Sequence, residues 1–128
     1  MTVVIDAAAL LAVLLDEPGA EVVLPVLRTS IMSAVNLSEA CSRGVERGAT
    51  IEAVLGAAKR FEVVVVPFDS AQAQRAAELR PETRHAGSSL GDRACLALAQ
   101  IRSLPIYTAD RRMGSLDGRL DIPIRLIR

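Results

Sequence analysis

The chain has 128 residues, of which 51% are hydrophobic, and its 15 basic and 15 acidic residues give a net charge of zero. This length predicts one domain spanning residues 1–128, with enough apolar side chains for a core. A net charge of zero argues against capture of nucleic acid by a broadly basic surface. A zinc site is not expected, because the chain has one histidine (His85) and two cysteines (Cys41 and Cys95) without a CxxC motif.

No membrane segment is expected from the hydrophobic stretches. The longest strongly apolar stretch without a charge, Ala7–Leu15, is about half as long as a membrane-spanning helix. No basic segment precedes it, as would be typical of a secretory signal. We therefore expect a cytoplasmic protein, in which Cys41 and Cys95 are buried free thiols in a reducing compartment.

In the first half of the chain, hydrophobic patterning predicts strands alternating with helices, starting with a buried strand at Val3–Ile5. The pair Pro18–Gly19 ends the first helix, Pro25 interrupts the second, and Thr50 caps the fourth. The expected elements are strands at 3–5 and 31–33, and helices at 7–16, 21–28, 36–47 and 51–60.

The alternation continues in the second half of the chain. Val63–Val66 is a run of four β-branched residues, which predicts a strand buried on both faces. Two capping patterns, Asp69 with Gln72 and Ser89 with Asp92, predict helix starts. The remaining expected elements are helices at about 70–80 and 90–102, a polar loop at 81–87, and strands at 105–108 and 124–127. This order predicts an α/β domain with a mainly parallel sheet.

Four acidic residues, Asp6, Glu39, Asp92 and Asp110, lie far apart in sequence, each just after a predicted strand or near the start of a predicted helix. In open parallel sheets such positions meet at the carboxyl ends of the strands. Two carboxylates ~4 Å apart repel by roughly 4 kcal/mol at an effective dielectric constant near 20. A proton or a divalent cation must relieve such repulsion, so convergence of these acids predicts a site for Mg²⁺ or Mn²⁺.

Each acid also has an ordinary structural explanation. Asp6 and Asp110 are good residues for helix N-caps. Asp92 lies in the first turn of a helix, where the helix dipole favours a carboxylate, and Glu39 can form an i,i+4 pair with Arg43. Asp92 is the most informative of the four, because the helix that carries it is apolar on most sides.

The segments around these acids are Val4–Ala7 (VIDA), Ser33–Glu39 (SAVNLSE), Ser89–Ala99 (SLGDRACLALA) and Leu104–Arg111 (LPIYTADR). In this order and spacing they closely resemble the PIN-domain ribonucleases of the VapC toxin family, nearly from end to end. The resemblance implies a three-layer α/β/α fold and Mg²⁺- or Mn²⁺-dependent endonucleolytic cleavage of RNA, as the toxin of a type II toxin–antitoxin pair. It also implies a cognate VapB-like antitoxin that inhibits the nuclease.

The acidic quartet of that family falls on Asp6, Glu39, Asp92 and Asp110. We expect Asp6 and Asp92 to be the principal metal ligands, with Glu39 and Asp110 completing the charge and orienting water. Many members carry Ser or Thr where this chain has Ala8, which predicts a weaker hold on the metal. Many also carry an aromatic residue shortly after the fourth acid, and none is present in the stretch 111–114.

Contacts to RNA are expected through phosphate groups, because the only aromatic residues are Phe61, Phe68 and Tyr107. Arginines near the acids are the candidate contacts, and a solvated charge or a surface pair is the alternative for each. These arginines are Arg43, Arg93 and Arg111, with Arg47 and Arg112 as further candidates.

The apolar segment Ala7–Leu27 is the expected interface, with a second copy in a homodimer or with an antitoxin helix. An internal helical hairpin explains this segment equally well. For the whole chain, the alternative function is a PIN-like domain that binds RNA or protein without catalysis.

Overall fold

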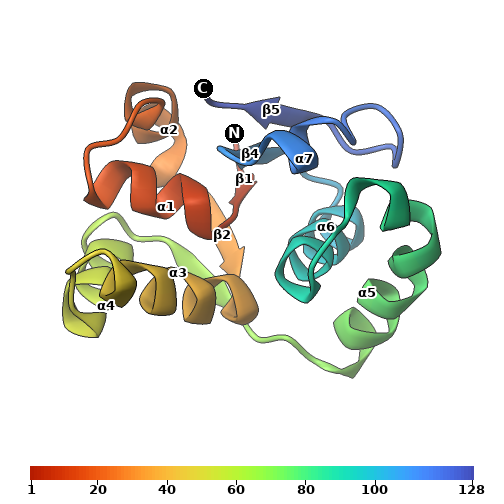
Figure 1. The fold of residues 1–128 in the computed structure, drawn as a ribbon, viewed down its shortest axis with the longest axis horizontal. Helices are drawn as coiled ribbons and strands as arrows, with labels where there is room; N and C mark the ends of the chain where they lie inside the picture. Colours follow the sequence, from red (N-terminus) through yellow and green to blue (C-terminus); the bar gives the residue numbers. More distant parts are fainter.

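Five short parallel strands form the centre of the molecule in a computed structural model that describes residues 1–128 (Figure 1). In spatial order the sheet is β3-β2-β1-β4-β5, and every neighbouring pair is parallel. The α/β class and the parallel sheet are therefore confirmed. In chain order the strands are β1 (Val3–Ile5), β2 (Ser30–Ser33), β3 (Val64–Val66), β4 (Ile106–Thr108) and β5 (Ile124–Leu126).

Helices cover both faces of the sheet, which gives the expected α/β/α layers (Figure 1). One layer holds α1 (Ala7–Leu14), α2 (Ala20–Leu27), α3 (Ala34–Glu46) and α4 (Ile51–Arg60). The other layer holds α5 (Ser70–Thr83), α6 (Leu90–Arg102) and the short α7 (Arg111–Gly114), with a 3₁₀ turn, η1, at Arg84–Ala86.

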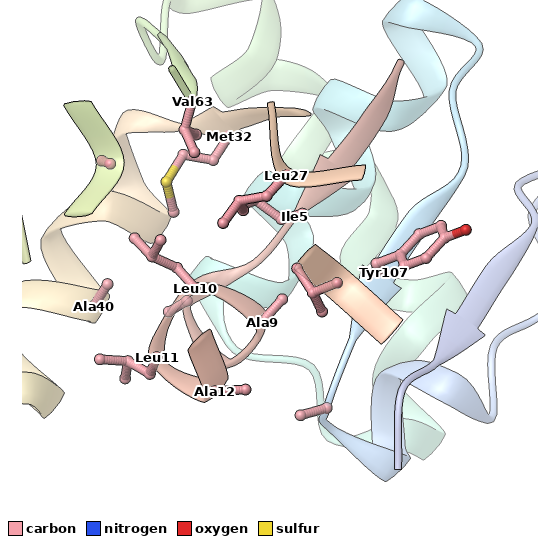
Figure 2. Close-up of a cluster of buried hydrophobic side chains, with 14 of the residues drawn as sticks. Ile5, Ala9, Leu10, Leu11, Ala12, Leu27, Met32, Ala40, Val63 and Tyr107 are labelled. Carbon is pink, nitrogen blue, oxygen red and sulfur yellow. The ribbon is translucent and has the colours of Figure 1, made fainter. Parts of the chain in front are cut away.

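Two apolar clusters hold these layers to the sheet, because successive strand residues point to opposite faces. Val3 and Ile5 lie in the cluster beneath α1–α4, whereas Val4 lies in the cluster beneath α5–α7. Figure 2 shows Ile5, Leu27 and other side chains of the first cluster converging from strands and helices. α6 is buried on most sides, as its sequence predicts.

The sequence prediction for β3 is wrong in one respect. Val64 is 58% exposed and Val65 is 36% exposed, so this strand is not buried on both faces. β3 lies at the edge of the sheet and pairs only with β2, so the helical layers do not enclose it as they enclose the central β1.

The prediction of a loop at Pro81–Gly87 is also wrong. α5 continues through Pro81 to Thr83, and η1 follows. Buried Leu79 and Thr83 hold this last turn against the core, and the Thr83 hydroxyl donates a hydrogen bond to the Leu79 carbonyl at 2.8 Å. Proline removes one helical hydrogen bond, and these tertiary contacts outweigh that loss. The four-residue α7 was not predicted.

Most of the apolar segment Ala7–Leu27 lies inside the molecule. Leu10 and Leu11 of α1 are buried, and α1 packs against α2, α3 and α4. The internal helical hairpin therefore explains most of this segment, and its outward face is largely α2, where Leu24 is 46% exposed. No helix is long and apolar enough to cross a membrane. Both cysteines are free, with Cys95 buried and Cys41 partly buried.

Truncation of the α6 core should be costly. Leu98 is fully buried, so Leu98→Ala is expected to lower the free energy of unfolding by about 2–5 kcal/mol. Leu55→Ala is the control, because Leu55 is 44% exposed, and it should change stability by about 0.5 kcal/mol or less. Urea unfolding of the three proteins measures both values. Equal losses for the two variants would contradict the burial assigned to α6.

Candidate functional site

The predicted acids gather at the carboxyl end of the central strands. β1 lies between β2 and β4, so the chain leaves β1 toward one side of the sheet and returns to the other side at β4. The crevice at such a reversal of strand order is the usual ligand site of an open parallel sheet. Asp6 directly follows β1, and Asp110 follows β4 by two residues.

Asp6 is the most enclosed of the four acids, with only 7% of its surface exposed. It is the N-cap of α1, where one carboxylate oxygen accepts a hydrogen bond from the Ala9 amide at 2.9 Å. The other oxygen accepts a hydrogen bond from the Thr108 hydroxyl. The side chain is therefore held in one orientation by bonds to both of its oxygens.

Thr108 connects Asp6 with Asp110. Its hydroxyl donates to Asp6 and accepts a hydrogen bond from the Asp110 amide at 2.9 Å. The parallel register pairs Ile5 with Tyr107, which brings Thr108 beside Asp6 at the ends of the two strands. A buried threonine thus fixes the relative position of two acids that are more than 100 residues apart.

Asp110 is the N-cap of α7. One of its oxygens accepts a hydrogen bond from the Arg112 amide at 2.8 Å. The Arg112 guanidinium lies 3.6 Å from the other oxygen and 3.5 Å from the Gly87 carbonyl. The expected cap role is correct for Asp110, and it leaves this carboxylate at the same sheet edge as Asp6.

Asp92 lies in the first turn of α6, where it forms the predicted capping box with Ser89. The Ser89 amide donates to one Asp92 carboxylate oxygen at 3.0 Å, and the Asp92 amide donates to the Ser89 hydroxyl at 3.2 Å. This box fixes the start of α6, while the carboxylate itself remains partly exposed.

Glu39 reaches the same place from α3. One of its oxygens accepts a hydrogen bond from the side-chain amide of Asn36 at 2.8 Å, and that amide also donates to the Gly91 carbonyl at 3.0 Å. Arg43 lies 3.8 Å from the other oxygen, so the predicted i,i+4 pair is present. Glu39 therefore forms the surface pair with Arg43 and also lies against α6.

The electrostatic effects connect Asp6 with Asp92 and Asp110, and they connect Glu39 with Asp6 and Asp92 through Cys95. The pKa of Asp6 is raised from 3.8 to about 6, chiefly by burial and also by the charges of Asp92 and Asp110, against the opposing hydrogen bonds from Thr108 and Ala9. Burial also raises the pKa of the Cys95 thiol, with added contributions from the charges of Asp6, Asp92 and Glu39. Cys95 is therefore near enough to three of the four carboxylates for their charges to act on it.

The chemistry of these donors fits a hard divalent cation. All four are carboxylates, the ligand type that Mg²⁺ and Mn²⁺ prefer. Asp6 and Asp92 have no ion pair with any Lys, Arg or His side chain, so the protein does not itself neutralise them. No three acidic, cysteine or histidine side chains are already arranged as a metal site. Ligation of one ion by three of them therefore requires side-chain rotation.

The arginines near the acids differ in availability. Arg43 is 47% exposed and lines an open hollow of about 540 Å³ along α3, together with Glu39 and two exposed serines, Ser38 and Ser42. Arg111 is exposed at the start of α7.

The other three candidate arginines are used within the fold, and Arg112 is the one beside Asp110. Arg47 pairs with Glu17 at 2.8 Å. Arg93 donates to the Ala76 carbonyl of α5 at 3.1 Å, and its Nε is buried. Of the arginines near the site, the structure therefore favours Arg43 and Arg111 as contacts for an external anion.

A sequence model of the PIN domain matches residues 3–119, which is most of the chain. The chain belongs to the PIN domain family. No curated protein sequence matches it significantly. The match covers all four acids, so Asp6, Glu39, Asp92 and Asp110 lie in the PIN domain itself.

Several solved structures share this PIN fold. VapC20 from Mycobacterium tuberculosis, described as a sarcin–ricin loop cleaving toxin, has a TM-score of 0.74 at 14% identity, over 94% of this chain and 98% of that chain. DNA-bound VapBC from Salmonella typhimurium has a TM-score of 0.73 at 19% identity, over 100% of this chain and 99% of that chain. VapBC-5 from Mycobacterium tuberculosis has a TM-score of 0.63 at 23% identity, over 98% of both chains.

Three residues of the site were not predicted from the sequence as parts of it: Thr108, Asn36 and Gly91. A hydroxyl at the end of a buried strand is the signal that could have identified Thr108, since its neighbours in β4 are apolar. Asn36 is a polar residue on the inner face of α3, three positions before Glu39. The role of Gly91 depends on contact between two helices, which no local pattern reveals.

The raised pKa of Asp6 predicts how the stability of the PIN domain depends on pH. Folding raises the pKa from 3.8 to about 6, so the folded state binds this proton more tightly than the unfolded state. Stability is therefore lost as pH rises from about 4 to 6, by an amount of order 3 kcal/mol.

Asp6→Asn removes this charge and keeps a good helix cap. In metal-free buffer the variant is expected to be more stable than wild type above pH 6, and about equally stable near pH 4. Urea unfolding at pH 4, 5 and 7 measures the difference. A wild type that is the more stable protein at pH 7 would contradict the assignment.

Proposed function

We propose that this PIN domain is a metal-dependent endoribonuclease and the toxin of a type II toxin–antitoxin pair. The observation that carries the proposal is the buried Asp6 carboxylate at the strand-order reversal, which has no ion pair and is acted on by the charges of Asp92 and Asp110. Such an arrangement is costly unless a cation completes it. The PIN family match and the similarity of the fold to VapC20 support the choice of RNA as substrate.

In the proposed mechanism, Asp6 and Asp92 are the principal ligands for Mg²⁺ or Mn²⁺, and Glu39 and Asp110 complete the charge. When bound, the ion supplies Lewis-acid activation of the phosphodiester and a lowered pKa for water. One oxygen of Glu39 is bonded by Asn36 and the other lies 3.8 Å from Arg43. Glu39 also lines the α3 hollow, where we expect it to orient the attacking water. In-line attack then leaves 5′-phosphate and 3′-hydroxyl ends, as the family suggests.

The hollow along α3 is the proposed path for the RNA backbone. Arg43 supplies a positive charge there, and Ser38 and Ser42 supply hydroxyl groups that can bond phosphate or ribose oxygens. Arg111, exposed at the start of α7, is the other candidate contact. Arg93 is set aside, because its guanidinium is bonded to α5.

A VapB-like antitoxin is the proposed partner, and the supporting observation is that similar folds occur in toxin–antitoxin complexes. These structures are a toxin–antitoxin complex from Klebsiella pneumoniae and VapBC complexes from Salmonella typhimurium and Rickettsia felis. A homodimer is also proposed, with the exposed face of α2 as one candidate surface.

The alternative is a PIN domain that binds RNA or protein without catalysis. The absence of three side chains already arranged around an ion favours it, as does Ala8. The retention of all four acids favours the nuclease. Cleavage of a mixed RNA panel that requires added Mg²⁺ or Mn²⁺ separates the two functions.

Asp6→Asn is expected to reduce cleavage at least 100-fold, because a neutral amide cannot hold the cation as a carboxylate does. Asp69→Asn is the matched control. Asp69 also caps a helix, accepting a bond from the Gln72 amide at 2.9 Å, but it is not one of the four acids. Single-turnover cleavage with Mn²⁺ measures both variants. Full activity in a folded Asp6→Asn protein would refute the site assignment.

Arg43→Ala is expected to raise KM for RNA several-fold, because it removes a positive charge from the hollow along α3. The slope of log affinity for RNA against log salt concentration should also become shallower by about 1, the value for one lost phosphate contact. Arg47→Ala, one turn further along α3, is the control and should leave both values unchanged. Equal KM values for Arg43→Ala and wild type at low and moderate salt would exclude the contact.

A further inference from the structure

Gly91 is the point where α3 and α6 meet at the acids. A Cβ atom at position 91 would overlap all three atoms of the Glu39 carboxylate. The backbone of Gly91 does not need glycine for its own conformation, because its φ is not in the left-handed region. The contact with Glu39 is therefore the reason that glycine is required there.

Asn36 holds the same carboxylate through a hydrogen bond from its side-chain amide. It is 1% exposed, and its side-chain amide bridges Glu39 and the Gly91 carbonyl. Its own carbonyl oxygen, Oδ1, is buried without a hydrogen-bond partner. An unpaired buried oxygen destabilises the fold, so Asn36 is a poor choice for packing alone. Its value lies in the two bonds that its amide donates.

We propose that Gly91 and Asn36 are positioning residues for the Glu39 carboxylate, and we call the place they form its seat. Gly91 directly precedes Asp92 in the sequence. Gly91 provides the space and Asn36 provides the bond that orients the carboxylate. Without the seat, Glu39 turns away toward solvent and the cation loses one of its four acidic neighbours. This inference rests on the proposed metal-dependent function and assigns two residues to it.

Gly91→Ala is the first test. The new methyl group would displace the end of a flexible side chain, so the fold should remain intact, and alanine favours a helix over glycine. We expect an unchanged or higher Tm, about tenfold weaker Mn²⁺ binding by isothermal titration calorimetry, and at least tenfold slower cleavage. Gly56→Ala is the matched control. Gly56 lies on the exposed side of α4 with open space around it, so that variant should gain Tm and keep both functions.

A double-mutant cycle shows whether Gly91 acts through Glu39. In a Glu39→Ala background the carboxylate is absent, so adding Gly91→Ala should cause no further loss of Mn²⁺ affinity or cleavage. Additive losses in this background would overturn the proposal, because they would mean that Gly91 affects the site independently of Glu39.

Asn36→Leu is the second variant, and it decides the question if Gly91→Ala does not fold. It keeps the bulk of the side chain and removes the bonding amide, so Mn²⁺ affinity should fall about tenfold. Gln72→Leu is its control. Gln72 is also a buried amide that donates to a backbone carbonyl, Pro67 at 3.0 Å, and its Oε1 is also unpaired. Loss of Mn²⁺ affinity in Asn36→Leu but not in Gln72→Leu supports the seat, and equal affinities overturn it.

Failure of this inference can be distinguished from failure of the proposed function. If wild type binds Mn²⁺ but cleaves no RNA, the proposed nuclease function is wrong, and the Mn²⁺-binding measurements still test the seat. If Asp6→Asn abolishes cleavage while Gly91→Ala and Asn36→Leu bind Mn²⁺ and cleave like wild type, the seat alone is wrong.

Discussion

The burial of the Asp6 carboxylate is the constraint around which the rest of the site is arranged. The same side chain begins α1, accepts the Thr108 hydroxyl bond, and lies where the charges of Asp92 and Asp110 act on it. Its two hydrogen bonds lower the cost of burying the charge but do not remove it, since its pKa remains about 6. The fold thus tolerates an unfavourable charge at its centre, and that charge is the most direct physical sign of a functional site.

The four acids are supported in two different ways. Asp6 and Asp110 are the N-caps of α1 and α7, and Asp92 bonds the amide of Ser89, the N-cap of α6. Backbone amides at helix starts therefore help to determine all three positions. Glu39 lies within α3 and has no such backbone support. Its position depends on side-chain contacts with Asn36 and on the space at Gly91. Helix capping is therefore not an alternative to a functional role for these acids, because the capping bonds also hold three of the carboxylates in position.

The sequence predicted the features that depend on local pattern. The strand at Val3–Ile5, the caps at Thr50 and Asp69, and the Ser89–Asp92 capping box follow from short-range chemistry, and the structure contains them. The failures depend on tertiary context. β-branched patterning could not show that β3 lies at a sheet edge, and Pro81 gave no sign that Leu79 and Thr83 would hold the helix beyond it. The Asn36–Glu39–Gly91 contact joins residues 55 positions apart, so no local pattern contains it.

The sheet order also governs when the site can come into existence. β4, which begins at Ile106, lies in the centre of the sheet beside β1. On a ribosome, the N-terminal helices can form early, but the place next to β1 stays empty until more than 100 residues have been made. Only then can Thr108 reach Asp6. A nascent chain that ends before β4 therefore contains Asp6, Glu39 and Asp92 without the assembled pocket, and any activity of this pocket requires synthesis to continue through β4.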